Sequence, residues 1–154
     1  MATRQLASVY CSAVDDGDPE RVVSLFVPGG GLSVYGRGKD TPMARLCGVD
    51  DFRRLTDALA RSYVRWVHFL GNHWVESDGE TAEGETYLMA CHLRDVDGTH
   101  VEEVAVLRYR DEYVRTADGW RFAERHARRQ WTSGRPLGET RHAIDAAMGP
   151  PRPG

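Results

Sequence analysis

Four long stretches in the second half of the chain decide its fold, and the first, residues 64–76, reads VRWVHFLGNHWVE. The other three read TAEGETYLMACHLR (residues 81–94), VEEVAVLRYRDEYVRT (101–116) and WRFAERHARRQW (120–131). Apolar and polar side chains tend to alternate in each, as in β-strands that bury one face. Asp-Gly pairs separate the stretches, and this dipeptide favours tight hairpin turns. The pattern predicts an antiparallel meander of four strands, with an irregularity at Gly71.

The first half of the chain carries a mainly helical pattern. One face of a first helix is expected to hold Leu6, Val9, Tyr10 and Ala13. Asp18 before Pro19 is a helix cap and first-turn pair, and it predicts a second short helix that ends at the Pro-Gly-Gly-Gly run 28–31. A short strand is expected at 32–35, a loop at 36–48, and then a third helix capped by Asp50.

Helices followed by a meander predict an α+β domain over residues 1–131. A curved sheet of this kind wraps around its helices and leaves a pocket between the two. Residues 132–154 are rich in Gly and Pro and are expected to form a poorly ordered tail, in which residues 141–148 can form a helical turn or two.

Composition narrows the function classes. The 154 residues are 41% hydrophobic and carry a formal net charge of -3, so no basic field favours nucleic acid or an acidic membrane. No apolar run approaches the length of a membrane span or of a signal peptide. The three cysteines show no zinc spacing, which indicates free thiols and a cytoplasmic protein. No phosphate loop follows the glycines of 28–31, and no cofactor is expected.

Two histidines are the leading candidates for chemistry. His68 and His92 each interrupt an apolar strand pattern, and Asp15 ends the first helix. An imidazole in an apolar wall can move protons near neutral pH. The alternative is that both histidines are merely packed and satisfied by hydrogen bonds. His73 suggests no metal site with His68, because an offset of five on a regular strand places the two side chains on opposite faces.

Several motifs carry a resemblance to a known family. They are Tyr10-Cys11-Ser12-Ala13-Val14-Asp15-Asp16-Gly17-Asp18, His68-Phe69-Leu70-Gly71-Asn72, Ala90-Cys91-His92-Leu93-Arg94, and residues 109–115 running into Asp118-Gly119-Trp120-Arg121-Phe122. With the order of elements, they resemble the SnoaL-like and scytalone dehydratase-like enzymes of the nuclear transport factor 2-like superfamily. The resemblance covers residues 3–131 and implies a cone-shaped α+β barrel.

The resemblance also implies roles for individual residues. Asp15 is expected to pair with His68 as the catalytic carboxylate and histidine, with His92 supplied by the next strand. Substrate contacts are expected from Tyr10, Tyr35, Tyr109 and Asp111. Scytalone dehydratase has a tyrosine directly before its carboxylate, where this chain has Val14, so the same substrate does not follow.

Three functions remain open from the sequence. The first is a cofactor-independent lyase or isomerase, a dehydratase or cyclase, that acts on a small carbonyl compound of polyketide or steroid type. The second is an epoxide-opening cyclase or hydrolase that uses Asp15, Asp111 and Tyr109. The third is a binding module without chemistry. Arg125 can anchor an anionic substrate group, but an exposed ion pair is the expected role. A homo-oligomer, dimer or trimer, is expected, since one sheet face is left open.

Overall fold

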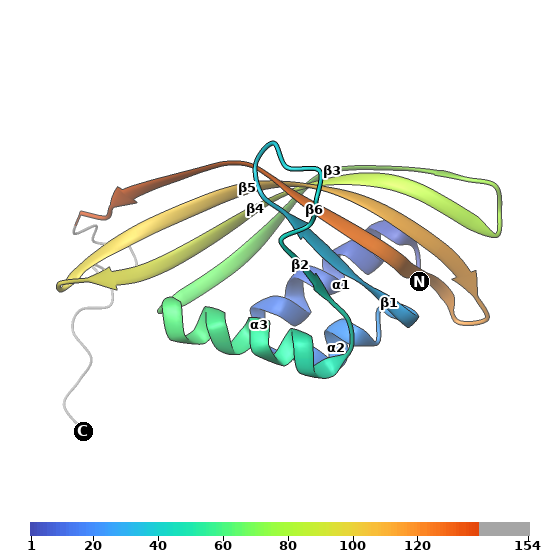
Figure 1. Ribbon diagram of the computed structural model, residues 1–154, viewed down its shortest axis with the longest axis horizontal. Coiled ribbons are helices and arrows are strands. Elements are labelled where there is room, and N and C mark those ends of the chain that lie inside the picture. Colours follow the sequence, from blue (N-terminus) through green and yellow to red (C-terminus); the bar gives the residue numbers. More distant parts are fainter. Residues whose placement is uncertain (139–154) are drawn as a thin grey trace, which may run out of the picture.

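The computed structural model describes residues 1–138 and has the α+β architecture expected from the sequence. The helices are α1 (Thr3–Asp15), α2 (Pro19–Val23) and α3 (Val49–Ser62). The strands are β1 (Phe26–Tyr35), β2 (Ala44–Leu46), β3 (Arg65–Ser77), β4 (Thr81–Val96), β5 (Thr99–Thr116) and β6 (Gly119–Pro136). All three helices lie on one side of an arched sheet (Figure 1). None of them, within this described part, is long and apolar enough to cross a membrane.

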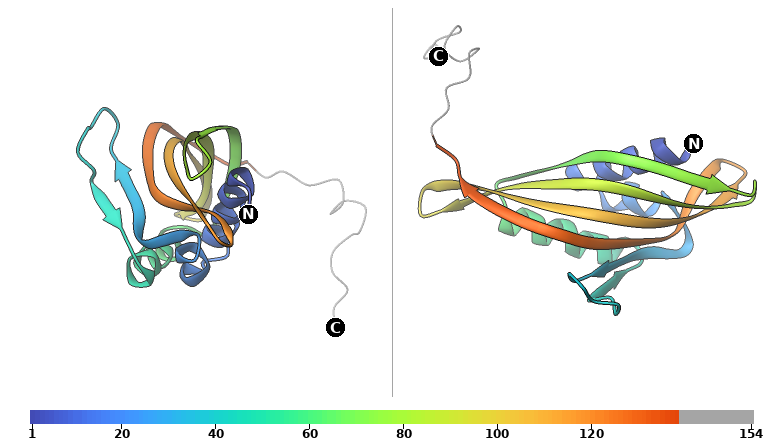
Figure 2. Two further views of the ribbon diagram at one scale, coloured as in Figure 1. Left: turned by 90° about the vertical axis from the view of Figure 1, so that its right-hand side faces the viewer. Right: turned by 90° about the horizontal axis from the view of Figure 1, so that it is seen from above.

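The sheet is continuous, with the strand order β2-β1-β6-β5-β4-β3. Strands β3 to β6 form the predicted antiparallel meander, and β1 joins it parallel to β6. The strands run side by side and curl around the helices (Figure 2). This curvature encloses the core between the concave face and α1, which packs mainly against β3.

The Pro-Gly-Gly-Gly run does not end a helix, contrary to the expectation. It lies inside β1, which begins at Phe26. A Cβ atom at Gly30 would lie 2.5 Å from the carbonyl oxygen of Ala123, and one at Gly31 would lie 2.5 Å from that of Leu46. The glycines therefore permit close approach of β1 to its neighbours rather than a turn.

Two further details of the first half differ from the expectation. The predicted loop 36–48 contains the short strand β2, which pairs with β1. Asp50 does not cap α3: the N-cap residue is Gly48, and Asp50 lies in the first turn, where it forms an ion pair with Arg53.

The irregularity expected at Gly71 is confirmed, and it has a consequence for His73. The register of β3 and β4 shifts between Leu70 and His73. The extra residue turns His73 toward the helices, on the same side as His68, where its ring contacts Thr86 at 2.8 Å and Thr3 at 3.4 Å. The expectation of opposite faces is wrong, because a bulge breaks the alternation.

The last strand is longer than expected. It continues past Trp131 to Pro136 because Val101 to Ala105 of β5 extend the pairing there. The helical turns expected at 141–148 lie outside the described residues. On the open face of the sheet, Phe69, Met89 and Trp131 are 58%, 45% and 55% exposed, and self-association through this face stays a prediction.

A buried ion pair joins β5 to β6. The Arg125 Nε atom donates to Asp111 Oδ1 at 2.8 Å and Nη2 donates to Oδ2 at 3.1 Å, and both side chains are fully buried. The hydroxyl of Tyr113 also donates to Asp111, and the rings of Tyr10, Tyr109 and Phe122 lie 4.2–4.3 Å from the guanidinium carbon. The exposed ion pair expected of Arg125 is therefore wrong.

Replacement of Arg125 by methionine should destabilise the fold strongly. It leaves the Asp111 carboxylate buried without its cation, which costs about 3–5 kcal/mol in the free energy of unfolding. Urea denaturation measures this change. The exposed variant Arg110→Met on β5 is the control and should shift the same quantity by less than about 0.5 kcal/mol. Equally small changes in the free energy of unfolding for the two variants would show that the ion pair does not stabilise the fold.

Candidate active site

The site begins where α1 ends. Asp15 is the last residue of this helix, and its carboxylate reaches β3. Oxygen Oδ2 accepts the backbone N–H of His68 at 3.1 Å, and Oδ1 lies 2.6 Å from the Nδ1 atom of the same residue. The indole of Trp66 donates to the carbonyl of Val14 at 3.1 Å, so three hydrogen bonds fix the helix end to the strand.

This contact determines the tautomer of His68. An ionised carboxylate only accepts hydrogen bonds, so Nδ1 carries the hydrogen, and in the neutral ring Nε2 keeps a free lone pair. The His68 side chain is 9% exposed, and that of Asp15 is 23% exposed. The same arrangement of acid and imidazole prepares the base in catalytic triads.

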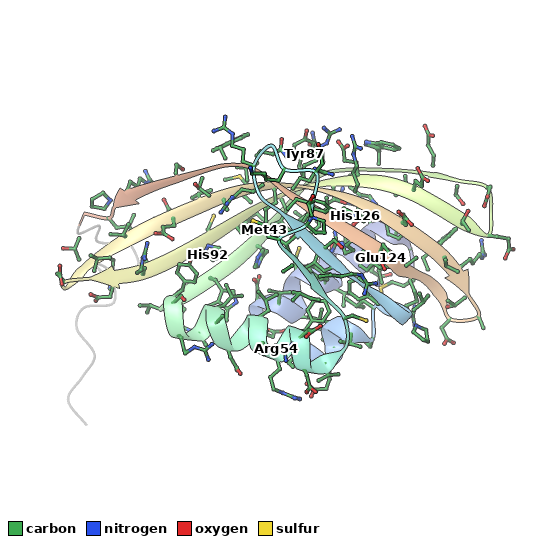
Figure 3. All side chains as sticks on the ribbon, in the orientation of Figure 1. Met43, Arg54, Tyr87, His92, Glu124 and His126 are labelled. Atoms are coloured by element: carbon green, nitrogen blue, oxygen red, sulfur yellow. The ribbon has the colours of Figure 1, made fainter. Side chains whose placement is uncertain are left out.

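His92 approaches His68 from the neighbouring strand. The register pairs Trp66 with His92 and His68 with Ala90, so the two histidines project from the same face. Their ring centroids lie 6.2 Å apart, with the planes at 80°. His92 lies on the helix-covered side of the sheet, whereas Tyr87 lies on the open side (Figure 3).

The environment of His92 keeps its ring neutral. Burial lowers the pKa of His92 to about 4, the neighbouring His68 lowers it as well, and Asp15 partly opposes the two. The ring of Tyr63 stacks on it, with centroids 4.3 Å apart and planes at 15°. At neutral pH, His92 therefore offers one N–H donor and one free ring nitrogen, not a cation.

Both histidines line a cavity of about 360 Å³ between the sheet and the helices. Most of the lining is apolar, including Val14, Leu55, Leu59, Ala90 and Leu107. Tyr10 and Tyr109 also line it. Burial raises the pKa of Tyr10 to about 12 and that of Tyr109 above its ordinary value, so both phenols stay protonated and can donate hydrogen bonds.

Two of the expected substrate contacts have other partners. Tyr35 borders the cavity, but its hydroxyl lies 3.1 Å from His126 Nδ1, and the Arg128 guanidinium covers its ring at 4.2 Å. Asp111 does not line the cavity, because its carboxylate is held by Arg125 in the core. Asp15, His68, His92, Tyr10 and Tyr109 are the candidates that the fold brings together.

Two residues at or beside the cavity were not singled out from the sequence. Tyr63 directly follows α3 and stacks on His92, and Arg129 on β6 lines the cavity. An aromatic residue at the end of a helix was a weak signal for Tyr63. For metal binding, residues 1–138 contain no group of three or more His, Cys, Asp or Glu side chains placed to hold an ion.

The fold is shared with several solved structures. One is a candidate scytalone dehydratase from Novosphingobium aromaticivorans, 18% identical, with 91% of this chain and 93% of that chain covered and a TM-score of 0.71. Another is the hexachlorocyclohexane dehydrochlorinase LinA-type3 from Novosphingobium barchaimii LL02, 18% identical, with 92% of each chain covered and a TM-score of 0.68. At this identity the likeness shows the fold alone.

Comparison of the sequence with protein-family models identifies the family. No curated protein matches the chain. The model of the SnoaL-like domain matches residues 2–126, most of the part that forms the helices and the sheet. The likeness to the dehydratase-like and LinA structures agrees with this match. The chain therefore belongs to the SnoaL-like domain family and has the cone-shaped α+β fold of the nuclear transport factor 2-like superfamily.

Proposed function

We propose that the protein is a cofactor-independent lyase or isomerase that acts on a small, mostly apolar carbonyl compound, such as a polyketide-like or steroid-like ring. One observation carries this proposal: an imidazole held by a carboxylate at 2.6 Å lines an apolar cavity beside a second, neutral imidazole. The names of two structural neighbours, a dehydratase and a dehydrochlorinase, describe eliminations and support the same reaction class.

The reaction begins with proton removal. Nε2 of His68 takes a proton from the carbon next to the substrate carbonyl, and Asp15 stabilises the imidazolium that forms. The electron pair of the broken C–H bond moves into an enolate. In the dehydration, the enolate re-forms the carbonyl, the bond to the β-hydroxyl breaks, and the proton held on His68 leaves with that hydroxyl as water. In the isomerisation, the proton returns to a different carbon.

His92 and the tyrosines stabilise the enolate. A neutral imidazole with a lowered pKa can polarise a carbonyl by donating its N–H. Tyr109 is a second donor, since its phenol stays protonated in the buried wall. Apolar walls strengthen both hydrogen bonds, because little water competes for the oxygen.

The alternatives fit the geometry less well. Opening an epoxide by hydrolysis needs a carboxylate that holds a water, but both oxygens of Asp15 are bound to His68 and both of Asp111 to Arg125. A binding module without chemistry does not account for a carboxylate–imidazole pair and a second imidazole 6.2 Å away around one cavity. Proton transfer remains the favoured function.

Removal of the imidazoles tests the reaction class. His68→Ala and His92→Ala should each lower turnover of β-hydroxy ketones ~10²–10⁴-fold, since each removes one placed proton-transfer or donor group. The rise of enone absorbance measures elimination in a panel of aryl and alicyclic substrates. Deuterium incorporation from heavy water, followed by NMR, measures proton removal separately. His100→Ala, an exposed histidine beside a turn, is the control. Full turnover in both cavity variants would contradict the proposal.

The neutral state of His92 can be measured directly. Because its pKa is lowered to about 4, its NMR signals should titrate near pH 4 and stay constant between pH 6 and 8. Between pH 4 and 6.5 the folded protein binds fewer protons at His92 than the unfolded chain does. The contribution of His92 to the free energy of unfolding is therefore complete above about pH 6.5 and decreases as the pH falls toward 4. A midpoint near the ordinary histidine value would show that His92 is cationic when the pH is mildly acidic and would remove its role as a neutral donor.

A further inference from the structure

A second cavity of about 410 Å³ adjoins the first. The two share His92, Ala105 and Arg129 in their linings. The second cavity is more polar than the first and is also lined by Tyr63, Glu103, Thr132 and Ser133. An apolar compartment, which His68 lines, and a polar compartment, which Thr132 and Ser133 of β6 line, therefore meet at these shared residues.

Arg129 stands at the junction without a partner. Its side chain makes no hydrogen bond or ion pair with any part of the chain between residues 1 and 138. Arg125, Arg128 and Arg129 form a cluster of arginines in the sequence of β6. The other two members are engaged: Arg125 binds Asp111, and Arg128 donates to the carbonyl of Lys39 and covers Tyr35. Arg129 is therefore the member of the cluster that is free to bind a ligand.

The acidic residue of the polar compartment is already neutralised. Glu103 forms an ion pair with Arg94, and its Oε2 atom accepts the hydroxyl of Tyr63 at 3.2 Å. The positive charge of Arg129 thus remains uncompensated where it meets both cavities. A guanidinium presents two parallel N–H groups, and a carboxylate accepts them with both oxygens. A doubly charged phosphate fits less well, because one arginine cannot balance two negative charges.

We propose that Arg129 binds a carboxylate of the substrate, at the end remote from the reacting carbon. This inference rests on the proposed function for the reacting end, where His68 removes the proton. Strand β6 lies three strands from β3, roughly 14 Å across the sheet at ~4.8 Å per strand. The substrate class is therefore a carbonyl compound whose ring body separates the carboxylate from the reacting carbon by several bonds, and not a simple keto or hydroxy acid.

A matched pair of ligands tests the carboxylate site. The probes are an acetylnaphthalene and the acetylnaphthoic acid that carries a carboxylate on the far ring, with dissociation constants measured by calorimetry at neutral pH. The wild-type protein should bind the acid roughly tenfold more tightly than the ketone, as for one charge-assisted hydrogen-bonded pair. Added salt should reduce this preference, because Arg129 is exposed.

Four variants separate the possible causes. Arg129→Met should abolish the preference for the acid, and Arg129→Lys should retain part of it. Arg110→Met, on the open face of the sheet, should retain all of it. His68→Ala should also retain it, because the carboxylate site does not need the base. As a control for folding, the thermal unfolding midpoint of Arg129→Met should equal that of the wild-type protein.

Two results would overturn the inference: equal binding of acid and ketone by the wild-type protein, or an unchanged preference in Arg129→Met. The protein could also prefer the acid through Arg129 and yet dehydrate none of the hydroxy ketones. That result would support the carboxylate site and contradict only the proposed reaction. The two proposals can thus fail separately.

Discussion

The attachment of helix α1 to strand β3 through one carboxylate is the contact on which the cavity depends. β3 is an edge strand that pairs only with β4, so the backbone groups along its free edge need partners from outside the sheet. Asp15 supplies such a partner with both oxygens, one to the backbone and one to the ring of His68. The same bonds that position the helix end also orient the imidazole. Structure and chemistry therefore share a residue, and a change at Asp15 affects both.

The two carboxylate pairs of the concave face differ in burial, and this difference separates their roles. Asp111 and Arg125 are fully buried, with rings on several sides, and no space for a substrate adjoins Asp111 on the cavity side. His68 lines the cavity, and the carboxylate of Asp15 binds its ring. The environments of His68 and His92 also differ, since one ring is bound by a carboxylate and the other is stacked on Tyr63 and desolvated. Neighbouring titratable groups in contrasting environments are the usual basis for dividing acid and base roles.

The sequence predicted the meander well because alternation and Asp-Gly turns are local signals. It misplaced the Pro-Gly-Gly-Gly run, since only the packed sheet shows that β1 must approach its neighbours so closely. The contact between Asp15 and His68 spans 53 residues of sequence, and the family resemblance rather than any spacing pointed to it. The alternation of side chains along β5 correctly placed Asp111 on the same face as Tyr109. It could not show that Tyr109 lies at the cavity while Asp111 lies in the core. Arg129 was missed because its place in the cavity wall depends on pairing with Leu107 of β5, which no local pattern in the sequence shows.

The tautomer of His68 tests the central claim most directly, because proton removal requires a free Nε2 atom aimed at the cavity. Nitrogen-15 NMR of the imidazole at neutral pH distinguishes the two neutral tautomers. We expect the hydrogen on Nδ1, where its hydrogen bond to Asp15 makes its NMR signal strongly deshielded. In the variant Asp15→Ala this deshielding should be lost. A hydrogen on Nε2, or a ring that averages between both tautomers in the wild-type protein, would contradict the assignment of His68 as the base.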